Sequence, residues 1–407
     1  MSKIKILAIP SDKHGVGKFR IMDPYTFIGE KHSDDVHVDI TFNAEDNDEY
    51  FLNYDIVVFH SFIHQTTHDS NVNRIKWLKS KGIKVIMDID DLWFVDQRHP
   101  MYHQIKASRI GEMKIEMMKL VDTITTTTPI FAKTIMDRLN VKNVQIFPNA
   151  VNEDESQFQV NTTKSDKIRF GWLGGSSHLH DLQLMNGFVS KLGNEINNKV
   201  QYVICGFDTR GSVTEINPKT GEQRRRDIRP DETVWAKYEQ IFTDNYRIID
   251  DNYKKFLLEY REAEYKSDIT LPYERVWTKP VTSYAMNYSK FDISLAPIKN
   301  HVFNRMKSQL KVIEAGFYKK ALIASEIGPY TIDLKHCLKN GEYVDGNAML
   351  VGENRNHSDW SKFIKKLVLN PNLITDMGER LYETVKDKYH LKNVTINRAE
   401  FYKSLIK

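Results

Sequence analysis

Short apolar runs alternate with helical stretches along this chain, and the alternation occurs twice. The first series of runs is apolar at consecutive positions and rich in β-branched residues, as is typical of strands buried on both faces of a parallel sheet. Helical patterns at 71–81, 105–120 and 130–139 separate several of them. Such alternation indicates βαβ units and therefore an α/β fold. The expected strands are Ile4–Ile9, Val36–Thr41, Ile56–His60, Val85–Ile89, Thr123–Thr127 and Val144–Phe147.

The alternation stops at a polar stretch, residues 152–166, and then begins again. A chain of 407 residues is long enough for two domains, so this stretch predicts the linker between them. Residues 207–266 do not fit the repeat, and we interpret them as an insertion that is either solvated or binds an acceptor or partner. The chain closes with helices expected at 360–368, 372–389 and 395–406. The second series of strands is expected at Ile168–Leu173, Val200–Cys205, Asp268–Leu271, Asp292–Ala296, Ala321–Ala324 and Ala348–Val351.

The charge balance and the cysteine count exclude several classes of protein. The chain carries 58 basic and 54 acidic residues, which is too even for the strongly basic face of a typical nucleic-acid-binding domain. Two cysteines make neither a disulfide framework nor a zinc site. Neither a signal peptide nor an apolar run approaching about 20 residues is evident. We therefore expect a cytoplasmic protein, with peripheral membrane contact or a viral protein in host cytoplasm left open.

A glycine-containing loop follows the first expected strand. Gly15, Gly17 and Arg20 lie in the sequence Gly-Val-Gly-Lys-Phe-Arg. Glycines after a strand let the backbone approach a phosphate or a sugar closely. The loop lacks the spacing of a phosphate-binding Walker A motif, and a simple tight turn is the alternative.

A second glycine turn follows the strand that begins at Ile168. Gly174, Gly175, Ser176 and His178 precede a helical pattern that starts at Leu179. The N-terminus of a Ser-capped helix offers free N–H groups, which suit a diphosphate, and His178 could contact a phosphate or a sugar hydroxyl. The alternative is a surface histidine.

A cluster of polar residues follows the strand that ends at Ala296. Lys307, Lys311 and Glu314 have the spacing of one helical face, with Asn304 and Ser308 beside them. Ligands of open α/β sheets bind at the carboxyl ends of strands, where a carboxylate can hold ribose hydroxyls and a lysine can neutralise a diphosphate. A surface ladder of ion pairs is the alternative.

An acidic cluster ends the fourth expected strand. Asp88, Asp90 and Asp91 would face the cleft between two domains, where they could bind a hydroxyl or a divalent metal. The alternative is a helix cap followed by a buried Trp93.

These four stretches, in this order, resemble the GT-B glycosyltransferases, and glycosyltransferase family 4 in particular. The stretch Ile146-Phe147-Pro148-Asn149-Ala150-Val151 resembles the segment that ends the family's first domain. The resemblance implies two Rossmann-like, doubly wound parallel-sheet domains facing across a cleft. Residues 1–155 would form the acceptor domain, residues 156–385 the nucleotide-sugar domain, and residues 386–407 a helix crossing back to the first domain.

The chain departs from the family at two positions. Asp90-Asp91-Leu92 stands where the family often has His-Asp-Leu, with the histidine near the transferred sugar. Met306 stands eight residues before Glu314, where the family often has a second glutamate. Lys307 or Asn304 could replace this missing sugar contact.

The resemblance also implies a mechanism. The donor would be a UDP- or GDP-sugar, no metal or other cofactor would be required, and the anomeric configuration would be retained. Lys307, the segment Gly174–His178 and Arg20 would offset charge on the diphosphate, with Lys311 also contacting the donor. Glu314 would hold the ribose, and Asp90 or Asp91 would orient the sugar or the acceptor. The acceptor would be a glycan, a lipid-linked sugar or a modified DNA base.

Three alternative functions remain open at the level of sequence. A metal-dependent transferase of the GT-A fold would use Asp88 and Asp90 as metal ligands. A viral enzyme that glycosylates hydroxymethylated pyrimidines in DNA would explain the basic run Arg224–Arg226. A non-catalytic nucleotide-sugar binding module would explain the two departures from the family pattern.

Overall fold

A six-stranded parallel sheet organises the first half of the chain. The computed structural model describes residues 3–406 except 46, 65–67, 98–101, 207–211, 218–219, 230–231, 244–272 and 354–356. The strand order is β2-β1-β3-β4-β5-β6, so the chain winds outward in both directions from β1 and β3. The six predicted strands of this half are confirmed to within one residue at each end. They are β1 Ile4–Ile9, β2 Val36–Ile40, β3 Ile56–His60, β4 Lys84–Asp88, β5 Thr123–Thr126 and β6 Val144–Ile146.

Helices cover both faces of this sheet, because successive strand residues point to opposite faces. Ile6 and Ala8 join one apolar cluster, whereas Leu7 and Ile9 join another. The helix predicted over 105–120 is two helices, since Arg109 adopts a left-handed conformation (φ 56°) between them. The helices are α1 Gly15–Gly17, the π-helix Lys18–Met22, α2 Asp23–Lys31, α3 Asp48–Phe51, α4 His68–Ser80, α5 Tyr102–Ala107, α6 Ile110–Leu120 and α7 Pro129–Leu139.

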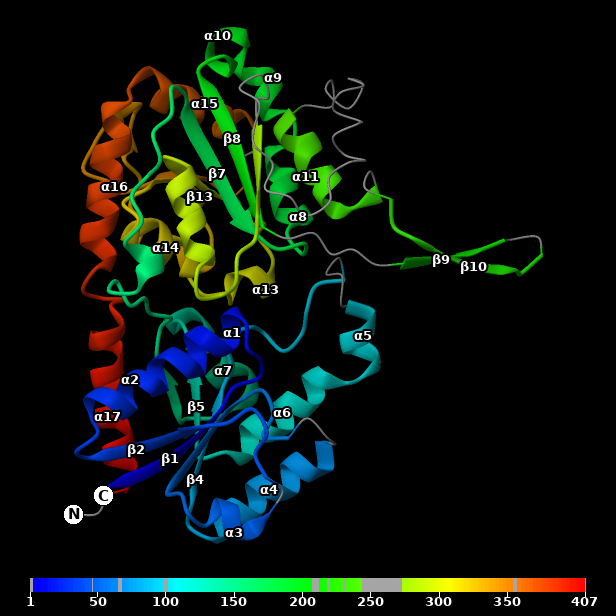
Figure 1. Cartoon of the computed structure of the whole chain (residues 1–407), viewed down its shortest axis with the longest axis vertical. Helices are drawn as coiled ribbons and strands as arrows, with labels where there is room; N and C mark the ends of the chain where they lie inside the picture. Colours follow the sequence, from blue (N-terminus) through cyan, green and yellow to red (C-terminus); the bar gives the residue numbers. More distant parts are fainter. Residues whose placement is uncertain are drawn as a thin grey trace.

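A second six-stranded parallel sheet organises the second half, in the order β11-β8-β7-β12-β13-β16 (Figure 1). The expected strand Asp268–Leu271 lies outside the described residues. Sequence analysis missed β11, whose Tyr-Glu-Arg-Val-Trp sequence looks too charged for a sheet. Arg275 is nevertheless buried, because its guanidinium pairs with Glu239 at 3.1 Å. The strands are β7 Ile168–Gly174, β8 Val200–Gly206, β11 Tyr273–Trp277, β12 Ile293–Ala296, β13 Ala321–Ser325 and β16 Met349–Val351.

One helix of the second half lies in the stretch that the sequence suggested is an insertion. The long helix α11, Val234–Thr243, lies within the expected insertion, yet its Trp235, Tyr238 and Phe242 are buried in the main core of this half. Part of that stretch is therefore core rather than a solvated elaboration. The other elements used below are α8 Leu179–Leu182, α9 Phe188–Leu192, the 3-10 helix Tyr284–Lys290, α13 Val302–Arg305, α14 Leu310–Phe317, α15 His357–Leu369 and α16 Asn372–Val385.

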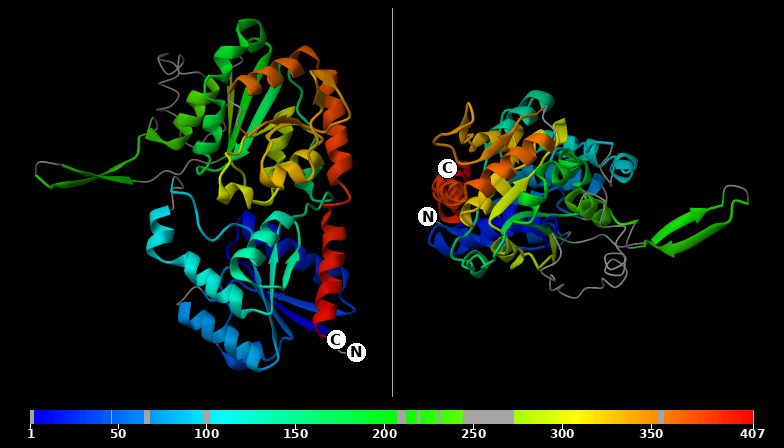
Figure 2. Two further views of the ribbon diagram at one scale, coloured as in Figure 1. Left: turned by 180° about the vertical axis from the view of Figure 1, so that it is seen from behind. Right: turned by 90° about the horizontal axis from the view of Figure 1, so that it is seen from above.

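The basic run Arg224–Arg226 lies on a two-stranded hairpin, β9 Ser212–Ile216 and β10 Gln223–Asp227. The hairpin extends away from both sheets (Figure 2). Arg226 is paired with Glu215 and with Glu232, each at 2.7 Å. Acidic neighbours therefore offset part of the positive charge of the run.

The last helix returns to the first half of the molecule. Helix α17, Leu391–Ile406, packs along α2 in the first half (Figure 1). The rings of Tyr402 and Tyr25 stack with centroids 5.8 Å apart, and their hydroxyls form a hydrogen bond. Arg398 donates to the carbonyl oxygen of Arg20 at 3.1 Å. The C-terminal residues thus complete the apolar cluster of the first sheet.

We expect Tyr402→Ala to lower the free energy of unfolding by about 3–5 kcal/mol, as for other buried aromatic truncations. Tyr402 is fully buried and belongs to the cluster formed by the first sheet. Urea denaturation followed by tryptophan fluorescence measures the change. Ile396→Ala is the matched control, because Ile396 is 41% exposed on the same helix. Equal effects of the two substitutions would show that α17 is not held by this face.

Candidate active site

A cavity of about 200 Å³ lies between the two halves, at the carboxyl ends of strands from both sheets. This is where open parallel sheets bind ligands. Eight of the residues singled out in the sequence line it: Gly15, Arg20, Asp90, Asp91, His178, Lys307, Ser308 and Lys311. Asn149, Asp181, Phe19 and Tyr330 line it as well. Gly17, Gly174, Gly175, Ser176, Asn304 and Glu314 do not.

The two glycines of the first loop have different roles. The carboxylate of Asp12 accepts the N–H groups of His14 at 2.8 Å and Gly17 at 3.2 Å, which closes the turn. A Cβ atom at Gly17 would lie 1.8 Å from the carbonyl oxygen of Asp12, so the turn requires glycine there. Nothing lies within 4 Å of a Cβ atom at Gly15, which faces the cavity. Gly15 is therefore the position where a ligand can approach the backbone.

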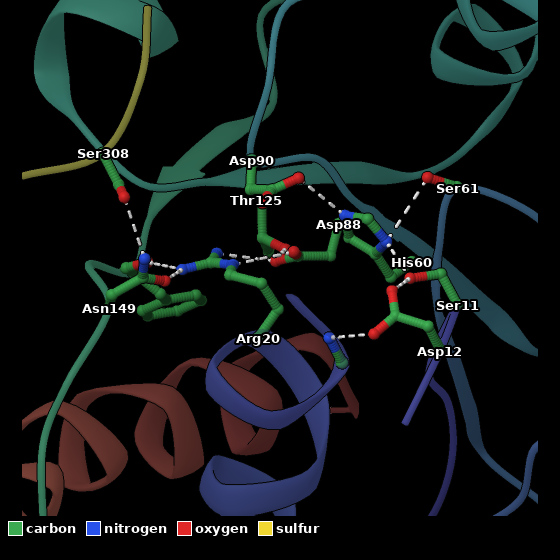
Figure 3. Close-up of polar contacts among 12 residues, drawn as sticks. Ser11, Asp12, Arg20, His60, Ser61, Asp88, Asp90, Thr125, Asn149 and Ser308 are labelled. Carbon is green, nitrogen blue, oxygen red and sulfur yellow. Dashed lines mark hydrogen bonds and ion pairs between the residues drawn. The ribbon is translucent and has the colours of Figure 1, made fainter. Parts of the chain in front are cut away.

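Arg20 is fully buried, and its guanidinium is paired with Asp88 through two hydrogen bonds of 2.9 and 2.7 Å (Figure 3). Burial by itself raises the pKa of Asp88, but the Arg20 charge lowers it below its usual value. Arg20 also donates to Asn149 at 3.1 Å, and Asn149 donates to Ser308 at 3.0 Å. The residue expected to neutralise a diphosphate thus has its charge offset by Asp88 and links the two halves.

Asp90 and Asp91 have contrasting surroundings at the end of β4. Burial raises the pKa of Asp90, but this effect is outweighed by the neighbouring His60 and Arg20, which hold the pKa well below its usual value. His60 Nε2 lies 2.9 Å from Asp90 Oδ1. Burial and the Asp90 charge raise the pKa of Asp91, against the influence of Lys307. Within the described part of the chain, Asp91 has no hydrogen-bond partner, so its carboxylate is available to a ligand.

Lys307 and Lys311 reach the cavity from different backbone segments, not from one helix as the sequence suggested. Helix α14 begins at Leu310, so Lys307 lies in the turn before it, and the expected common face of Lys307, Lys311 and Glu314 on one helix is wrong. Both lysines nevertheless line the cavity. Lys311 donates to the carbonyl oxygen of Leu173 and lies over the Trp172 ring at 5.2 Å. Burial lowers the pKa of Lys311 to about 8, and Lys307 adds to the lowering.

Glu314 is buried one turn further along α14, where two tyrosines cover it. Its carboxylate accepts hydrogen bonds from the hydroxyls of Tyr284 and, at 2.9 Å, Tyr288. Burial raises the pKa of Glu314, whereas the two hydroxyls and Lys311 oppose the shift. In this conformation Glu314 is held by protein groups, so its contact with a ribose stays a prediction.

Met306 stands where the family often has its first glutamate, and Lys307 and Asn304 are the two residues that could replace the missing sugar contact. Met306 packs with Phe303 into an apolar cluster of the first half and does not line the cavity. Asn304 is buried, donates to Asp181 at 2.8 Å and lines an adjacent cavity of about 30 Å³. Lys307 lines both cavities, so it is the better placed of the two to contact a sugar.

The second glycine turn is braced by a residue from α11. The Tyr238 hydroxyl donates to the Gly175 carbonyl at 3.0 Å and accepts the N–H of His178 at 3.0 Å. The predicted Ser-capped helix is only the single turn α8, and the N-cap residue before it is His178, which makes no side-chain cap. The dipole expected to attract a diphosphate is correspondingly small, because few peptide units are aligned.

The His178 ring is held by Asp181, which sequence analysis missed. Asp181 accepts from His178 Nδ1 at 2.9 Å and also from the backbone N–H of Lys299 at 2.8 Å. Burial lowers the pKa of His178 to about 4, Lys307 and Lys311 reinforce this, and Asp181 opposes it. Since a neutral ring with Nδ1 protonated leaves Nε2 as an acceptor, His178 suits a sugar hydroxyl better than a phosphate. The spacing His-x-x-Asp was the only sequence signal.

We expect the free energy of unfolding to fall as the pH drops from about 6.5 to about 4, with His178 contributing roughly 3 kcal/mol. In this window the unfolded chain binds a proton at His178 that the folded protein excludes, so stability is complete above the window and is lost below it. His178→Asn keeps a donor for Asp181 and does not titrate. Urea denaturation of both proteins at pH 4.5 and 7.5 measures the difference. Parallel pH profiles would contradict the expectation.

The acidic cluster does not have the form required by the GT-A alternative. Asp88 is engaged by Arg20 and by the Thr125 hydroxyl, which donates at 2.6 Å. No group of three or more His, Cys, Asp or Glu side chains is arranged for a metal within the described residues. The two parallel six-stranded sheets rule out the GT-A fold. None of the described helices is both long enough and apolar enough to span a membrane.

Comparison with known proteins supports the fold through structure alone. No protein-family profile and no curated sequence matches this chain. HepE of Anabaena, solved with UDP and glucose, is 9% identical, with a TM-score of 0.58 over 98% of this chain and all of its own.

Two further solved structures cover the whole of this chain. The catalytic domain of starch synthase IV from Arabidopsis thaliana, bound to ADP and acarbose, is 10% identical over all of both chains, with a TM-score of 0.57. The trehalose-6-phosphate synthase of Burkholderia multivorans is 10% identical, with a TM-score of 0.53 over all of this chain and 99% of its own. These structures are GT-B glycosyltransferases, whereas membership of family 4 stays a prediction. This chain therefore has the GT-B fold.

Proposed function

We propose that this protein is a glycosyltransferase that transfers a sugar from a nucleotide-diphosphate sugar to an acceptor hydroxyl. The observation that carries the proposal is the charge distribution in the interdomain cavity. Lys307 and Lys311 line it from the second half, and Asp90 and Asp91 line it from the first. A nucleotide sugar has the matching polarity, with an anionic diphosphate at one end and neutral hydroxyls at the other.

This polarity orients the donor. The diphosphate lies toward Lys307 and Lys311, because the two aspartates repel it. The sugar ring then lies toward Asp91 and the Nε2 atom of His178, both of which accept hydrogen bonds from hydroxyls. Gly15 lets the backbone approach the ring from the side of the first loop.

The donor in this proposal is a UDP- or GDP-sugar. In support, HepE has been solved with UDP-glucose and the starch synthase domain with ADP, and both proteins have a similar fold. The ribose lies beyond Lys311, toward Glu314 on the next turn of α14. For Glu314 to bind ribose hydroxyls, the Tyr284 hydroxyl must leave the carboxylate.

The proposed reaction retains the anomeric configuration and requires no metal. The acceptor oxygen bonds to the anomeric carbon on the face from which the diphosphate leaves, the bond from that carbon to the phosphate oxygen breaks, and the phosphate oxygen takes the acceptor proton. The two lysines stabilise the charge that develops on the diphosphate. The protein also positions the reactants and excludes water, which protects the donor from hydrolysis.

Nucleotide release from a panel of UDP-, GDP- and ADP-sugars tests the proposal, with and without chelator. We expect slow, chelator-resistant release from one donor and its loss in Glu314→Ala. NMR of the product determines its anomeric configuration. Binding of a nucleotide sugar without turnover over a panel of acceptors would instead favour the non-catalytic module. Release that requires a divalent metal would contradict the metal-independent mechanism.

We propose a glycan or lipid-linked sugar as the acceptor rather than a modified DNA base. Glu215 and Glu232 offset the charge of Arg226, which reduces the positive surface that DNA would need. A DNA acceptor would give activity on hydroxymethylated DNA that falls steeply with salt concentration. That result would reverse this choice of acceptor and leave the donor site unchanged.

A further inference from the structure

A chain of hydrogen bonds connects the first glycine loop to Asp90, and the proposed function does not use it (Figure 3). Asp12 Oδ2 lies 2.7 Å from Ser11 Oγ, and Ser11 Oγ lies 2.9 Å from His60 Nδ1. His60 Nε2 lies 2.9 Å from Asp90 Oδ1. His60 is buried at the carboxyl end of β3, and its side chain is 6% exposed.

Counting protons along this chain assigns the state of His60. Asp12 accepts two backbone N–H groups with its other oxygen, as expected for a carboxylate, so the Ser11 hydroxyl donates its only proton to Asp12. Ser11 Oγ can then only accept, which requires a proton on His60 Nδ1. An aspartate is a carboxylate near pH 7, so Asp90 Oδ1 accepts and His60 Nε2, 2.9 Å away, must also donate. Both ring nitrogens therefore carry protons.

The surrounding charges are compatible with an imidazolium at this position. Asp88 lies close enough to interact with His60, but its charge is offset by Arg20. On the cavity side, His60 interacts with Asp90 and Asp91, and these two carboxylates also interact with Lys114, and Asp91 with Lys307. The Ser61 hydroxyl, 3.3 Å from Nδ1, is a second oxygen beside the ring. A proton on His60 therefore has three carboxylates near it, Asp88, Asp90 and Asp91.

We propose that His60 is a positioning residue that locks Asp90 as an oriented carboxylate and couples it to the glycine loop. Asp12 holds the loop through two backbone N–H groups, and His60 holds Asp90, so both walls of the sugar end of the cavity depend on one imidazolium. Asp90 Oδ1 is occupied by His60, which leaves Oδ2 to accept a hydroxyl of the transferred sugar or of the acceptor. This inference rests on the proposed function, since it assigns a ligand group to the same cavity.

Two amide substitutions test the hydrogen bonds of the two His60 ring nitrogens separately. His60→Gln places an amide near the position of Nε2 and can still donate to Asp90. His60→Asn places an amide near the position of Nδ1 and reaches only Ser11. We expect His60→Asn to lower kcat/KM for the sugar donor by about 10- to 100-fold, the effect of losing one hydrogen bond to a charged group. We expect His60→Gln to recover part of this loss.

Comparing the affinity for UDP alone with kcat/KM for the sugar donor distinguishes a positioning role of His60 from a general loss of structure in the variant. The affinity for UDP alone, measured by calorimetry, should be unchanged in His60→Asn, because the diphosphate lies at the lysine end. His60→Asn should add little to the effect of Asp90→Ala, since His60 is proposed to act on the sugar only through Asp90. His37→Asn, at an exposed histidine of the same half, is the matched control. Loss of UDP affinity in His60→Asn, or additive effects of the two substitutions, would overturn the proposal.

A measurement that needs no turnover keeps this inference separate from the proposed function. Nitrogen NMR of the histidine rings near pH 7, with His60→Asn identifying the signal, should show both His60 nitrogens protonated. If the wild-type protein releases no nucleotide from any donor but His60 is an imidazolium, the enzyme proposal fails and the structural coupling stands. A neutral His60 ring would overturn the coupling even in an active enzyme.

Discussion

Asp88→Asn is expected to lower the free energy of unfolding of the first half by about 3–5 kcal/mol, because it leaves the buried Arg20 charge without a partner. Arg20 is fully buried and Asp88 is 1% exposed. Asparagine keeps the shape of the side chain but not its charge, and its amide cannot accept both guanidinium bonds. Urea denaturation monitored by circular dichroism measures the shift of the first transition.

Two further variants test whether the destabilisation by Asp88→Asn comes from the unpaired Arg20 charge. Asp137→Asn, at an exposed acid of the same half, should change stability by less than about 0.5 kcal/mol. The double variant Arg20→Met, Asp88→Leu should recover most of the loss, since a buried ion pair can often be replaced by apolar groups. A double variant as unstable as Asp88→Asn would show that the hydrogen bonds of Arg20 to Asn149 and the Phe147 carbonyl matter more than its charge balance.

Lys307→Met is expected to lower kcat for nucleotide release by about 100- to 1000-fold, the usual effect of removing one group that stabilises transition-state charge. Methionine keeps most of the length and the apolar stem that packs at Phe303, where Nζ lies 5.0 Å from the ring. The substitution therefore removes the charge with little loss of packing. Steady-state kinetics with the donor found in the panel measures the change.

The matched control is Lys319→Met, because Lys319 is a half-exposed lysine of the same half, paired with Glu379. Its kcat should equal that of the wild-type protein. An increase in KM with unchanged kcat in Lys307→Met would mean that Lys307 binds donor and transition state equally and does not stabilise the developing charge. Wild-type values for both constants would remove Lys307 from the donor site.

The strands of both sheets were largely predictable because they are local features of the sequence. Consecutive apolar, β-branched residues such as Ile56–His60 have few alternatives to a strand buried on both faces. The exception that the structure describes is β11, in which the burial of Arg275 depends on Glu239, 36 residues away. The break between α5 and α6 was missed because no Gly or Pro marks the left-handed Arg109.

The site could be predicted in part, because its residues follow strands whose carboxyl ends meet at one edge. This logic singled out Asp90, Asp91 and His178, and all three line the cavity, whereas their roles stay predictions. It failed for the partners of these groups. No local pattern relates His60 to Asp90, or Arg20 to Asp88, since these contacts join side chains 30 and 68 residues apart.

The sequence by itself determined that this chain forms two α/β units with polar residues at the strand ends, because periodicity and turn residues act over a few positions. Only the tertiary structure decided which of those polar groups keep a free charge. Arg20 and Asp88 neutralise each other, Glu314 is covered by two tyrosines, and Lys307 and Asp91 face the cavity. The reason is physical: the charge that a group presents to a ligand depends on its burial and on partners that folding brings from distant parts of the chain.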